Sequence, residues 1–288
     1  LRKKILFTLF IILVYRLGNA VPVPYVNTAM LESYFNTVNN TILGLWNTMS
    51  GGSFSMATIF ALSIQPYINA SIIIQLLTIA IPALERLQKE GGEEGRKKIA
   101  SITRYTTVGI GLIMGFAYYM LIKNGVNGQS MLTSDGVGIW PAIVIIMTFM
   151  AGSALIMWMG EQVTEFGVGN GISIILFASI IARFPSSIGT MITNVSNGSL
   201  AWWALALVII GALAIIVLIV IVNDAERRIP VQYSKRVVGR KLYGGQSTHL
   251  PMKVNMSGVL PIIFAQSIAS IPGTICAFVP SWQDSWLM

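Results

Sequence analysis

The stretch LAWWALALVIIGALAIIVLIVIV, residues 200–222, contains no charged side chain. A helix that crosses a bilayer needs roughly 20 mostly apolar residues, and this stretch meets that requirement without interruption. Apart from a tryptophan pair near its start, it is apolar on all sides. Because it offers no polar face to water, it predicts a membrane-spanning helix that faces lipid.

Six further segments are apolar and long enough, or nearly long enough, to cross a bilayer. They are residues 5–21, 55–82, 100–122, 139–159, 171–192 and 256–279. Only 10% of the 288 residues are charged, against about a quarter in soluble domains. The sequence therefore predicts an all-α, polytopic membrane helix bundle that crosses the bilayer about seven times.

Positive charge gathers on one side of the membrane if the N-terminus is cytoplasmic. The segments on that side then carry all but three of the 19 lysines and arginines, and the exceptions are Arg16, Lys123 and Arg183. Basic loops are retained in the cytoplasm. The sequence thus predicts a cytoplasmic N-terminus and an outside position for the last residues of this chain.

Two predicted spans contain polar interruptions. Segment 55–82 holds Gln65, Asn69 and Gln75 among isoleucines, and segment 256–279 holds Gln266 and Ser267. Polar groups in hydrocarbon need partners or water. We expect both helices to face the protein interior or an aqueous cavity, although hydrogen bonding between helices without any pathway explains the same pattern.

The stretch ILGLWNTMSGG, residues 42–52, precedes the second predicted span and is apolar on average. At about 1.5 Å per residue it is too short to cross a hydrocarbon core of about 30 Å. The glycines Gly51 and Gly52 would make it hinged. It is either a re-entrant helix beside a cavity or an interfacial helix on the outer surface.

No catalytic constellation stands out in the sequence. His249 is the only histidine, Cys276 is the only cysteine, and no metal-ligand spacing or phosphate-binding loop is present. Residues 167–171 are glycine-rich but lack the strand-turn-helix context of a dinucleotide site, so they predict a tight turn into the next helix. Glu161 and Glu165 share one face of a cytoplasmic helix end, where we expect them to be solvated. We expect no enzyme, no cofactor and no metal.

The longest polar stretch, residues 223–255, is a basic cytoplasmic loop. Its charges alone could serve only to orient the helices, but loops of this length are uncommon unless they are functional. We therefore predict a partner-binding loop. Its candidate residues are Arg227, Arg228, Lys235, Arg236, Arg240, Lys241 and His249.

Several stretches resemble the SecY family, the central subunits of the bacterial protein-conducting channel. They are IPVQYSKRVVGRKLYGGQSTHLPMKVNMSGVLPIIFA (229–265), IFALSIQPYINASIIIQLL (59–77), GEQVTEFGVGNGISIILFA (160–178), KEGGEEGRKKI (89–99) and RYTT (104–107). The resemblance covers essentially the whole chain. It differs in length, because the family has ten helices and this chain stops after the seventh.

The resemblance implies a clamshell of two halves around an hourglass pore. Residues 1–195 would form the N-terminal half with helices one to five, and residues 196–288 would begin the second half with helices six and seven. It implies a pore ring of Ile64, Ile68, Ile172, Leu176 and Ile263. The spacing of Ile64, Ile68 and Ile72 does place one aliphatic stripe on a helix, although ordinary core or lipid contact explains that stripe equally.

The resemblance also implies a plug and a lateral gate. The plug would be residues 42–52, with Leu43, Leu45, Trp46, Met49, Gly51 and Gly52 beneath the pore ring. The gate would include Asn69, Ile72, Gln75, Gln266 and Ser267, where a signal sequence would bind as a helix.

The function implied is passage of unfolded secretory polypeptides and lateral release of transmembrane segments in the bacterial plasma membrane. The implied partners are the channel subunits SecE and SecG, the motor ATPase SecA, the ribosome through rRNA phosphates, signal sequences, nascent chains and membrane lipids. A secondary transporter with interrupted helices is the alternative, and a membrane-anchored scaffold that uses only the basic loop is a third.

Overall fold

The computed structural model describes residues 2–37, 42–125, 130–136, 138–199, 201–231, 236–238, 241–243, 248–255 and Ala265. The described chain divides by packing into two compact units, one ending at Ser186 and the other running from Ser187 to Gln266. These units are defined by packing and do not test the two predicted halves, residues 1–195 and 196–288. The halves therefore stay a prediction.

The first unit is helical. Its elements are α1 (Arg2–Gly18), α2 (Thr28–Thr37), α3 (Ile42–Met49), α4 (Gln65–Ala80), α5 (Pro82–Lys89), α6 (Gly92–Asn124), a 3-10 turn (Ser134–Gly136), α7 (Ile139–Phe166), α8 (Gly171–Ile181) and the start of α9 (Phe184–Ser196). The second unit holds the rest of α9, then α10 (Trp202–Asp224) and the strands β1 (Glu226–Val231), β2 (Arg236–Val238), β3 (Lys241–Tyr243) and β4 (Thr248–Lys253).

Four helices of the described chain are long and apolar enough to cross a membrane. They are α6, α7, the run Gly171–Ser196 that joins α8 to α9, and α10; the bent pair α4 and α5 would be a fifth. The first predicted span, 5–21, falls on α1, which has 17 residues and a length of about 25 Å. The seventh, 256–279, lies outside the described residues apart from Ala265, so the count of seven stays a prediction.

The second predicted span differs from the structure. Residues 51–64 form turns interrupted by an isolated β-bridge from Thr58 to Pro22, and α4 begins only at Gln65, with Pro66 in its first turn. The backbone before α4 is bonded elsewhere, because Ala57 O accepts from Val23 N at 2.9 Å and Ile59 N donates to Val21 O at 3.1 Å. These bonds replace those of a helix, so the prediction of one continuous span over 55–82 is wrong for residues 55–64.

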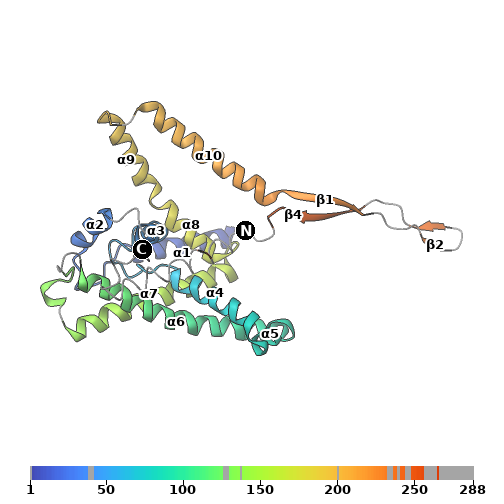
Figure 1. The fold of residues 1–288 in the computed structure, drawn as a ribbon, viewed down its shortest axis with the longest axis horizontal. Helices are drawn as coiled ribbons and strands as arrows, with labels where there is room; N and C mark the ends of the chain where they lie inside the picture. Colours follow the sequence, from blue (N-terminus) through green and yellow to red (C-terminus); the bar gives the residue numbers. More distant parts are fainter. Residues whose placement is uncertain are drawn as a thin grey trace, which may run out of the picture. The chain divides into compact units, whose positions relative to one another are not determined.

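The far end of α4 is bent by a proline. Pro82 follows Ile81 and begins α5, which is turned 101° from α4. The residue before a proline is disfavoured in the helical region, and Ile81 has φ −108° and ψ 111°. Figure 1 shows α5 turning away at the end of α4.

Helices α6 and α7 lie side by side (Figure 1) because glycines let their backbones approach. A Cβ atom on Gly111 would lie 2.8 Å from Ser153 Oγ, and one on Gly115 would lie 3.3 Å from the Ile146 carbonyl oxygen. Small residues four apart are a common means of packing membrane helices closely. Helices α4 and α5 pack against α6, and α1 and α8 pack against α7.

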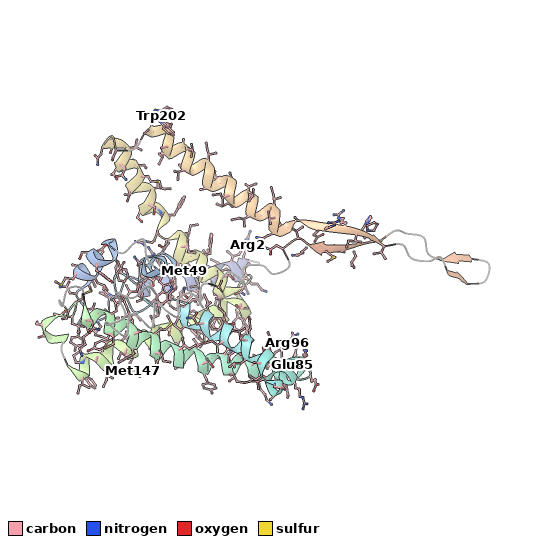
Figure 2. All side chains as sticks on the ribbon, viewed as in Figure 1. Arg2, Met49, Glu85, Arg96, Met147 and Trp202 are labelled. Carbon is pink, nitrogen blue, oxygen red and sulfur yellow. The ribbon has the colours of Figure 1, made fainter. Side chains whose placement is uncertain are left out.

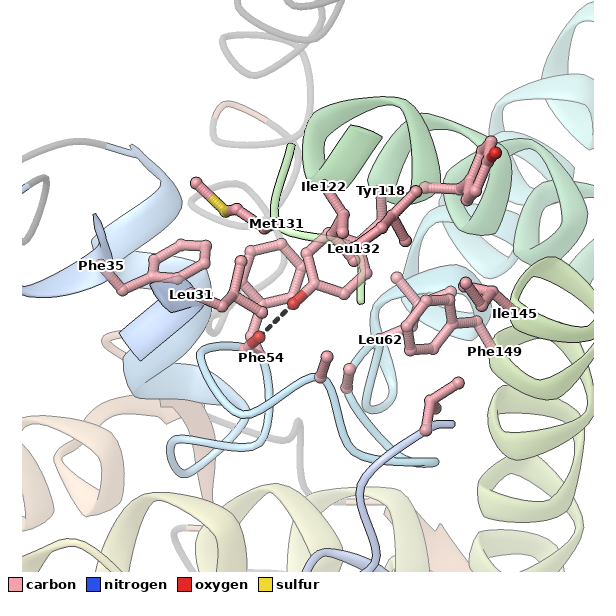
Figure 3. Close-up of a cluster of buried hydrophobic side chains, with 14 residues drawn as sticks. Leu31, Phe35, Phe54, Leu62, Tyr118, Ile122, Met131, Leu132, Ile145 and Phe149 are labelled. Atoms are coloured by element: carbon pink, nitrogen blue, oxygen red, sulfur yellow. Dashed lines mark hydrogen bonds between the residues drawn. The ribbon is translucent and has the colours of Figure 1, made fainter. Parts of the chain in front are cut away.

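The turns before α4 form part of the core rather than a surface loop. Figure 3 shows Phe54 between Phe35 of α2 and Tyr118 of α6. The Phe54 and Tyr118 rings stack at 4.3 Å, and the Tyr118 hydroxyl donates a hydrogen bond to the Phe54 carbonyl oxygen. Aromatic pairs of this kind add about 0.5–1.5 kcal/mol beyond their buried area.

In the second unit, the predicted loop 223–255 contains regular structure. Strands β1 and β4 pair antiparallel with Glu226 opposite Lys253 and Val231 opposite Thr248, and β2 pairs with β3. The polar stretch is therefore an extended ribbon that follows α10, not an irregular loop (Figure 1). Helix α10 has no buried residue, which is the environment expected of a lipid-facing helix.

Candidate functional site

The described members of the predicted pore ring gather at one apolar cluster. Ile64 belongs to the cluster itself, and Ile68, Ile172 and Leu176 pack against it. Its other buried members come from α1, α7, α8 and the turns before α4: Ile11, Tyr15, Phe60, Ile156, Met159, Val163 and Ile175. The fifth predicted ring residue, Ile263, lies outside the described residues.

Each ring residue has a definite place on its helix. Ile64 is the residue just before α4, and Ile68 follows one turn later. Ile172 and Leu176 lie one turn apart on α8, whose first turn is capped by Asn170. The Asn170 Oδ1 atom accepts from the Ile172 amide at 3.1 Å and the Ser173 amide at 3.4 Å. The predicted tight turn at 167–171 is confirmed.

A close approach of α7 and α8 positions Ile172. A Cβ atom on Gly160 would lie 3.0 Å from Ile172 Cγ1, and one on Gly171 would collide with the Gly160 carbonyl oxygen. At Gly171 only glycine fits without moving the helices apart, whereas at Gly160 the Ile172 side chain would have to shift slightly. The ring residues of α8 are therefore held against α7 by backbone contact.

The described candidates for the ring are all aliphatic and uncharged. Ile64 is 2% exposed and so is sealed inside the cluster, whereas Ile68, Ile172 and Leu176 are partly buried at its edge. A narrow aliphatic constriction excludes ions by dewetting and needs no charge to do so. Among the described residues no group of three histidine, cysteine or acidic side chains could hold a metal ion.

The predicted plug is helix α3 followed by a turn at Gly51 and Gly52. Trp46 packs against the aromatic core, and Met49 Sδ accepts a hydrogen bond from Gln65 Nε2 at 3.4 Å. The last turn of α3 therefore contacts the first turn of α4, one residue from the ring member Ile64. The side chains of Leu43 and Leu45 lie outside the described residues.

A buried polar network closes the turn after α3. The Asn47 carbonyl oxygen accepts from the Gly52 amide at 2.9 Å, and Asn47 Oδ1 accepts from the Ser55 amide at 3.0 Å. Ser50 Oγ accepts from the Phe54 amide at 3.1 Å. Gly51 and Gly52 take positive φ values of 69° and 89°, which glycine adopts without strain. Sequence reasoning missed this network, whose signal is the run of serines between Ser50 and Ser55.

The gate candidates on α4 have mixed environments. Asn69 Nδ2 donates to Met114 Sδ of α6 at 3.8 Å, a weak contact, while Ile72 is buried and Gln75 is exposed. The other two candidates, Gln266 and Ser267, lie outside the described residues. The structure thus describes only one side of the predicted gate.

An ion pair joins α6 to α7. Arg104 Nε lies 2.8 Å from Glu161 Oε1, and their side chains are 54% and 26% exposed. The expectation that Glu161 is merely solvated is wrong, because a basic residue of another helix lies within reach. Glu165 is exposed, as expected.

A basic surface forms where α5 meets the start of α6. A cavity of about 560 Å³ there is lined by Gln88, Lys89, Arg96, Ile99 and Ala100. Figure 2 shows Arg96 and Glu85 at this end of the unit. Glu85 bonds Lys89 at 2.6 Å, and this hydrogen bond raises the pKa of the Lys89 ammonium above its ordinary value.

The predicted partner-binding residues fall on the ribbon, as far as they are described. Arg227 and Arg228 lie on β1 and His249 on β4, all exposed. Arg236 lies on β2 and Lys241 on β3, and the structure describes only their backbone. Lys235 and Arg240 lie outside the described residues. Alternation along a strand puts Ile229 and Leu250, which pair directly, on one face of the ribbon.

Apolar helices of membrane length, and an apolar cluster with a short helix packed beside it, are the features of a polytopic helical membrane protein. The SecY family model matches residues 58–288. The protein translocase subunit SecY of Streptomyces scabiei is 42% identical over 96% of this chain and 64% of its own length. That of Aquifex aeolicus is 41% identical over 97% of this chain and 65% of its length, and that of Escherichia coli K12 is 41% identical over 96% and 62%.

Solved structures agree with this fold. A protein-conducting channel superposes with a TM-score of 0.66 at 17% identity, covering 96% of this chain and 58% of that one. Sec61 in the canine ribosome-channel complex from the endoplasmic reticulum gives 0.65 with the same coverage. The chain belongs to the SecY family and is a multi-pass membrane protein. It spans somewhat less than two thirds of the length of the three relatives named above.

Proposed function

We propose that this chain supplies part of a protein-conducting channel subunit, which passes unfolded secretory polypeptides across the membrane and releases apolar segments sideways into lipid. One observation carries the proposal: the apolar cluster that holds the four described ring candidates lies beside the short helix α3, through the contact of Gln65 with Met49. Membership of the SecY family supports it independently. A transporter would need a charged or coupling residue at depth, and the described residues of this cluster include no charged side chain.

The ring would seal the closed pore against ions and would widen around a polypeptide during transport. Aliphatic side chains exclude ions by dewetting when closed, and they can part around many different side chains because they form no specific bond with any of them. The plug would swing away about Gly51 and Gly52, since both already occupy the left-handed backbone region. The channel would need no active site, and the energy for transport would come from its partners.

Lateral release would use the α4 side of the site. A signal helix that entered between helices would displace the weak contact of Asn69 with Met114 and gain lipid contact for its own apolar face. Membrane lipids are therefore partners in this step. Gln75 is exposed and would be available to polar groups of the entering segment.

The ribbon would dock cytoplasmic partners. Arg227, Arg228 and His249 are exposed and basic or ionisable, and such charges suit rRNA phosphates or the acidic groups of SecA. A solved relative of the same fold was studied in a ribosome-channel complex. SecE and SecG would complete the channel. We place the protein in the bacterial plasma membrane with its N-terminus in the cytoplasm, on the distribution of basic residues.

The test is reconstitution of the complete subunit with its channel partners in vesicles. The expected result is protected, ATP-dependent uptake of an unfolded secretory protein, which a signal-sequence deletion in that substrate abolishes. Uptake of a small solute coupled to an ion gradient, without any polypeptide transport, would favour the transporter instead.

A further inference from the structure

We infer that the end of α8 and the turn after it form the seat of the plug, an inference that rests on the channel function proposed above. The seat consists of Ser179, which lies against Gly51, and Arg183, which lies beside Gly52; Tyr15 of α1 holds Ser179 in position. These three residues would keep the plug closed until a polypeptide displaces it.

The contact of Gly51 with Ser179 is made by backbone. A Cβ atom on Gly51 would lie 2.5 Å from the Ser179 carbonyl oxygen and 3.4 Å from its Cα. Gly51 also has φ +69°, a conformation that other residues rarely adopt. The chain after α3 therefore lies against the backbone of α8 with no room for a side chain at Gly51. Any shift of Ser179 along or across α8 would remove that support.

Ser179 is fixed by two buried hydrogen bonds. Its hydroxyl lies 2.8 Å from the Ile175 carbonyl oxygen, to which it donates, and 2.7 Å from the Tyr15 hydroxyl. A serine hydroxyl has one hydrogen, so the Tyr15 hydroxyl must donate the second bond. Tyr15 is 1% exposed and stacks on Phe60 at 5.7 Å, so it cannot turn to another partner. Displacing Ser179 would leave a buried hydroxyl unpaired, which is costly.

Arg183 adds an electrostatic contact. Its Nε atom lies 3.4 Å from the position that a Cβ on Gly52 would occupy. Gly52 is folded back over the last turn of α3, because its amide donates to the Asn47 carbonyl oxygen at 2.9 Å. The guanidinium therefore lies at the C-terminal end of the plug helix, where the helix dipole favours a positive charge. This contribution should weaken as salt is raised.

The experiment measures exposure of the plug in the complete, reconstituted subunit. The reporter is a cysteine at Ser53, which is 3% exposed, in a Cys276→Ala background. Its modification by an impermeant maleimide added from outside gives the rate of plug opening. The test variants are Tyr15→Phe, Ser179→Ala, the double variant and Arg183→Gln. The matched controls are Tyr119→Phe, a buried tyrosine of α6 for which the structure gives no bond to the plug, and Arg16→Gln, an exposed cation on α1.

We expect Tyr15→Phe and Ser179→Ala each to raise the modification rate about fivefold, the worth of one buried hydrogen bond. The double variant should show no more than the larger single effect, because both changes remove the same bond. Arg183→Gln should raise the rate at low salt and match the parent at high salt. The control variants should be modified at the parent rate. Across the test variants, a faster modification rate should not be accompanied by a lower midpoint of thermal unfolding.

If all test variants are modified at the parent rate and transport polypeptides normally, the proposed seat is wrong. The proposed channel function is not affected by that result. The seat also fails if the single effects of Tyr15→Phe and Ser179→Ala add in the double variant, or if the rate rises only in proportion to reduced stability. Should either of those variants fail to fold, the salt-dependent comparison of Arg183→Gln with Arg183→Lys decides alone, since lysine retains the charge. Absence of transport in the parent protein would instead count against the channel function.

Discussion

Gln65 Nε2 donates a hydrogen bond to Met49 Sδ at 3.4 Å, which joins the first turn of α4 to the last turn of α3. Gln65 directly follows the predicted ring residue Ile64, and Met49 lies two residues before Gly51 of the predicted plug. The predicted plug and the predicted ring are therefore neighbours, and this contact between them is weak. A sulfur acceptor bonds weakly, so the contact can position the plug without preventing its release.

A reducible cross-link should lock this contact. In the Cys276→Ala background, a short bis-methanethiosulfonate should join Met49→Cys to Gln65→Cys, because the ends of the parent side chains touch and the reagent replaces the length that the shorter cysteine side chains lose. Polypeptide transport should fall on cross-linking and return on reduction. Cross-linking is read from a mobility shift after cleavage between the two positions. The control pair Thr48→Cys and Gln65→Cys should cross-link far less, since Thr48 is exposed and bonds Gly44 within its own helix.

A polar residue in the ring should open the closed pore to ions. Ile68→Asn or Leu176→Asn should raise ion leak about tenfold, the effect of lowering a dewetting barrier by about 1.4 kcal/mol. Single-channel or vesicle-flux recordings of the reconstituted subunit measure the leak. Ile73→Asn is the matched control, because Ile73 is on the same helix but 42% exposed. A leak equal to that of the control would remove Ile68 and Leu176 from the ring.

The contact of α7 with α8 should not tolerate a methyl group. Gly171→Ala would drive a Cβ into the Gly160 carbonyl oxygen and displace Ile172, so we expect the unfolding free energy to fall by about 1–3 kcal/mol. Denaturation in detergent, followed by circular dichroism, measures this change. In contrast, Gly109→Ala on α6 meets nothing within 4 Å and should be neutral or slightly stabilising. Equal stabilities for the two variants would show that the backbones can separate without cost.

The ion pair of Arg104 with Glu161 should contribute little to stability. A double-mutant cycle with Arg104→Gln and Glu161→Gln should give a coupling of about 0.5 kcal/mol, because the Arg104 side chain is 54% exposed and solvent screens the pair. The coupling should shrink further in high salt. A coupling several times larger would mean that the pair is shielded from water in the assembled channel.

The ribbon should bind its partner through charge. Arg227→Gln and Arg228→Gln should each weaken ribosome binding. Each should also make the slope of log affinity against log salt concentration less steep by about 1 for each phosphate that is no longer neutralised. Reversing the charge of Arg240 and Lys241 should act in the same direction. Ile229→Gln, on the apolar face, should leave the salt dependence unchanged. Binding that is independent of all four basic residues would leave the ribbon with only its topological role.

Several features could be predicted because their causes are local. Residues 200–222 have to avoid water whatever surrounds them, so hydropathy alone located α10. Asn170 caps α8 within its own turn, and the spacing of Ile172 and Leu176 places both on one side of that helix. The ribbon was missed because its strands are short and its pairing joins residues about twenty positions apart, such as Ile229 with Leu250.

Sequence by itself determined that this is a membrane protein of apolar helices and which aliphatic residues share a helix face. Only the tertiary structure decided that residues 51–64 are not helical, because Ala57 O and Ile59 N bond to Val23 and Val21 of a distant segment and the backbone bonds within this segment close short local turns. It also decided that Ser179 supports Gly51. Hydropathy is a property that each segment carries with it, whereas the partner of a buried polar group depends on which segments the fold brings together.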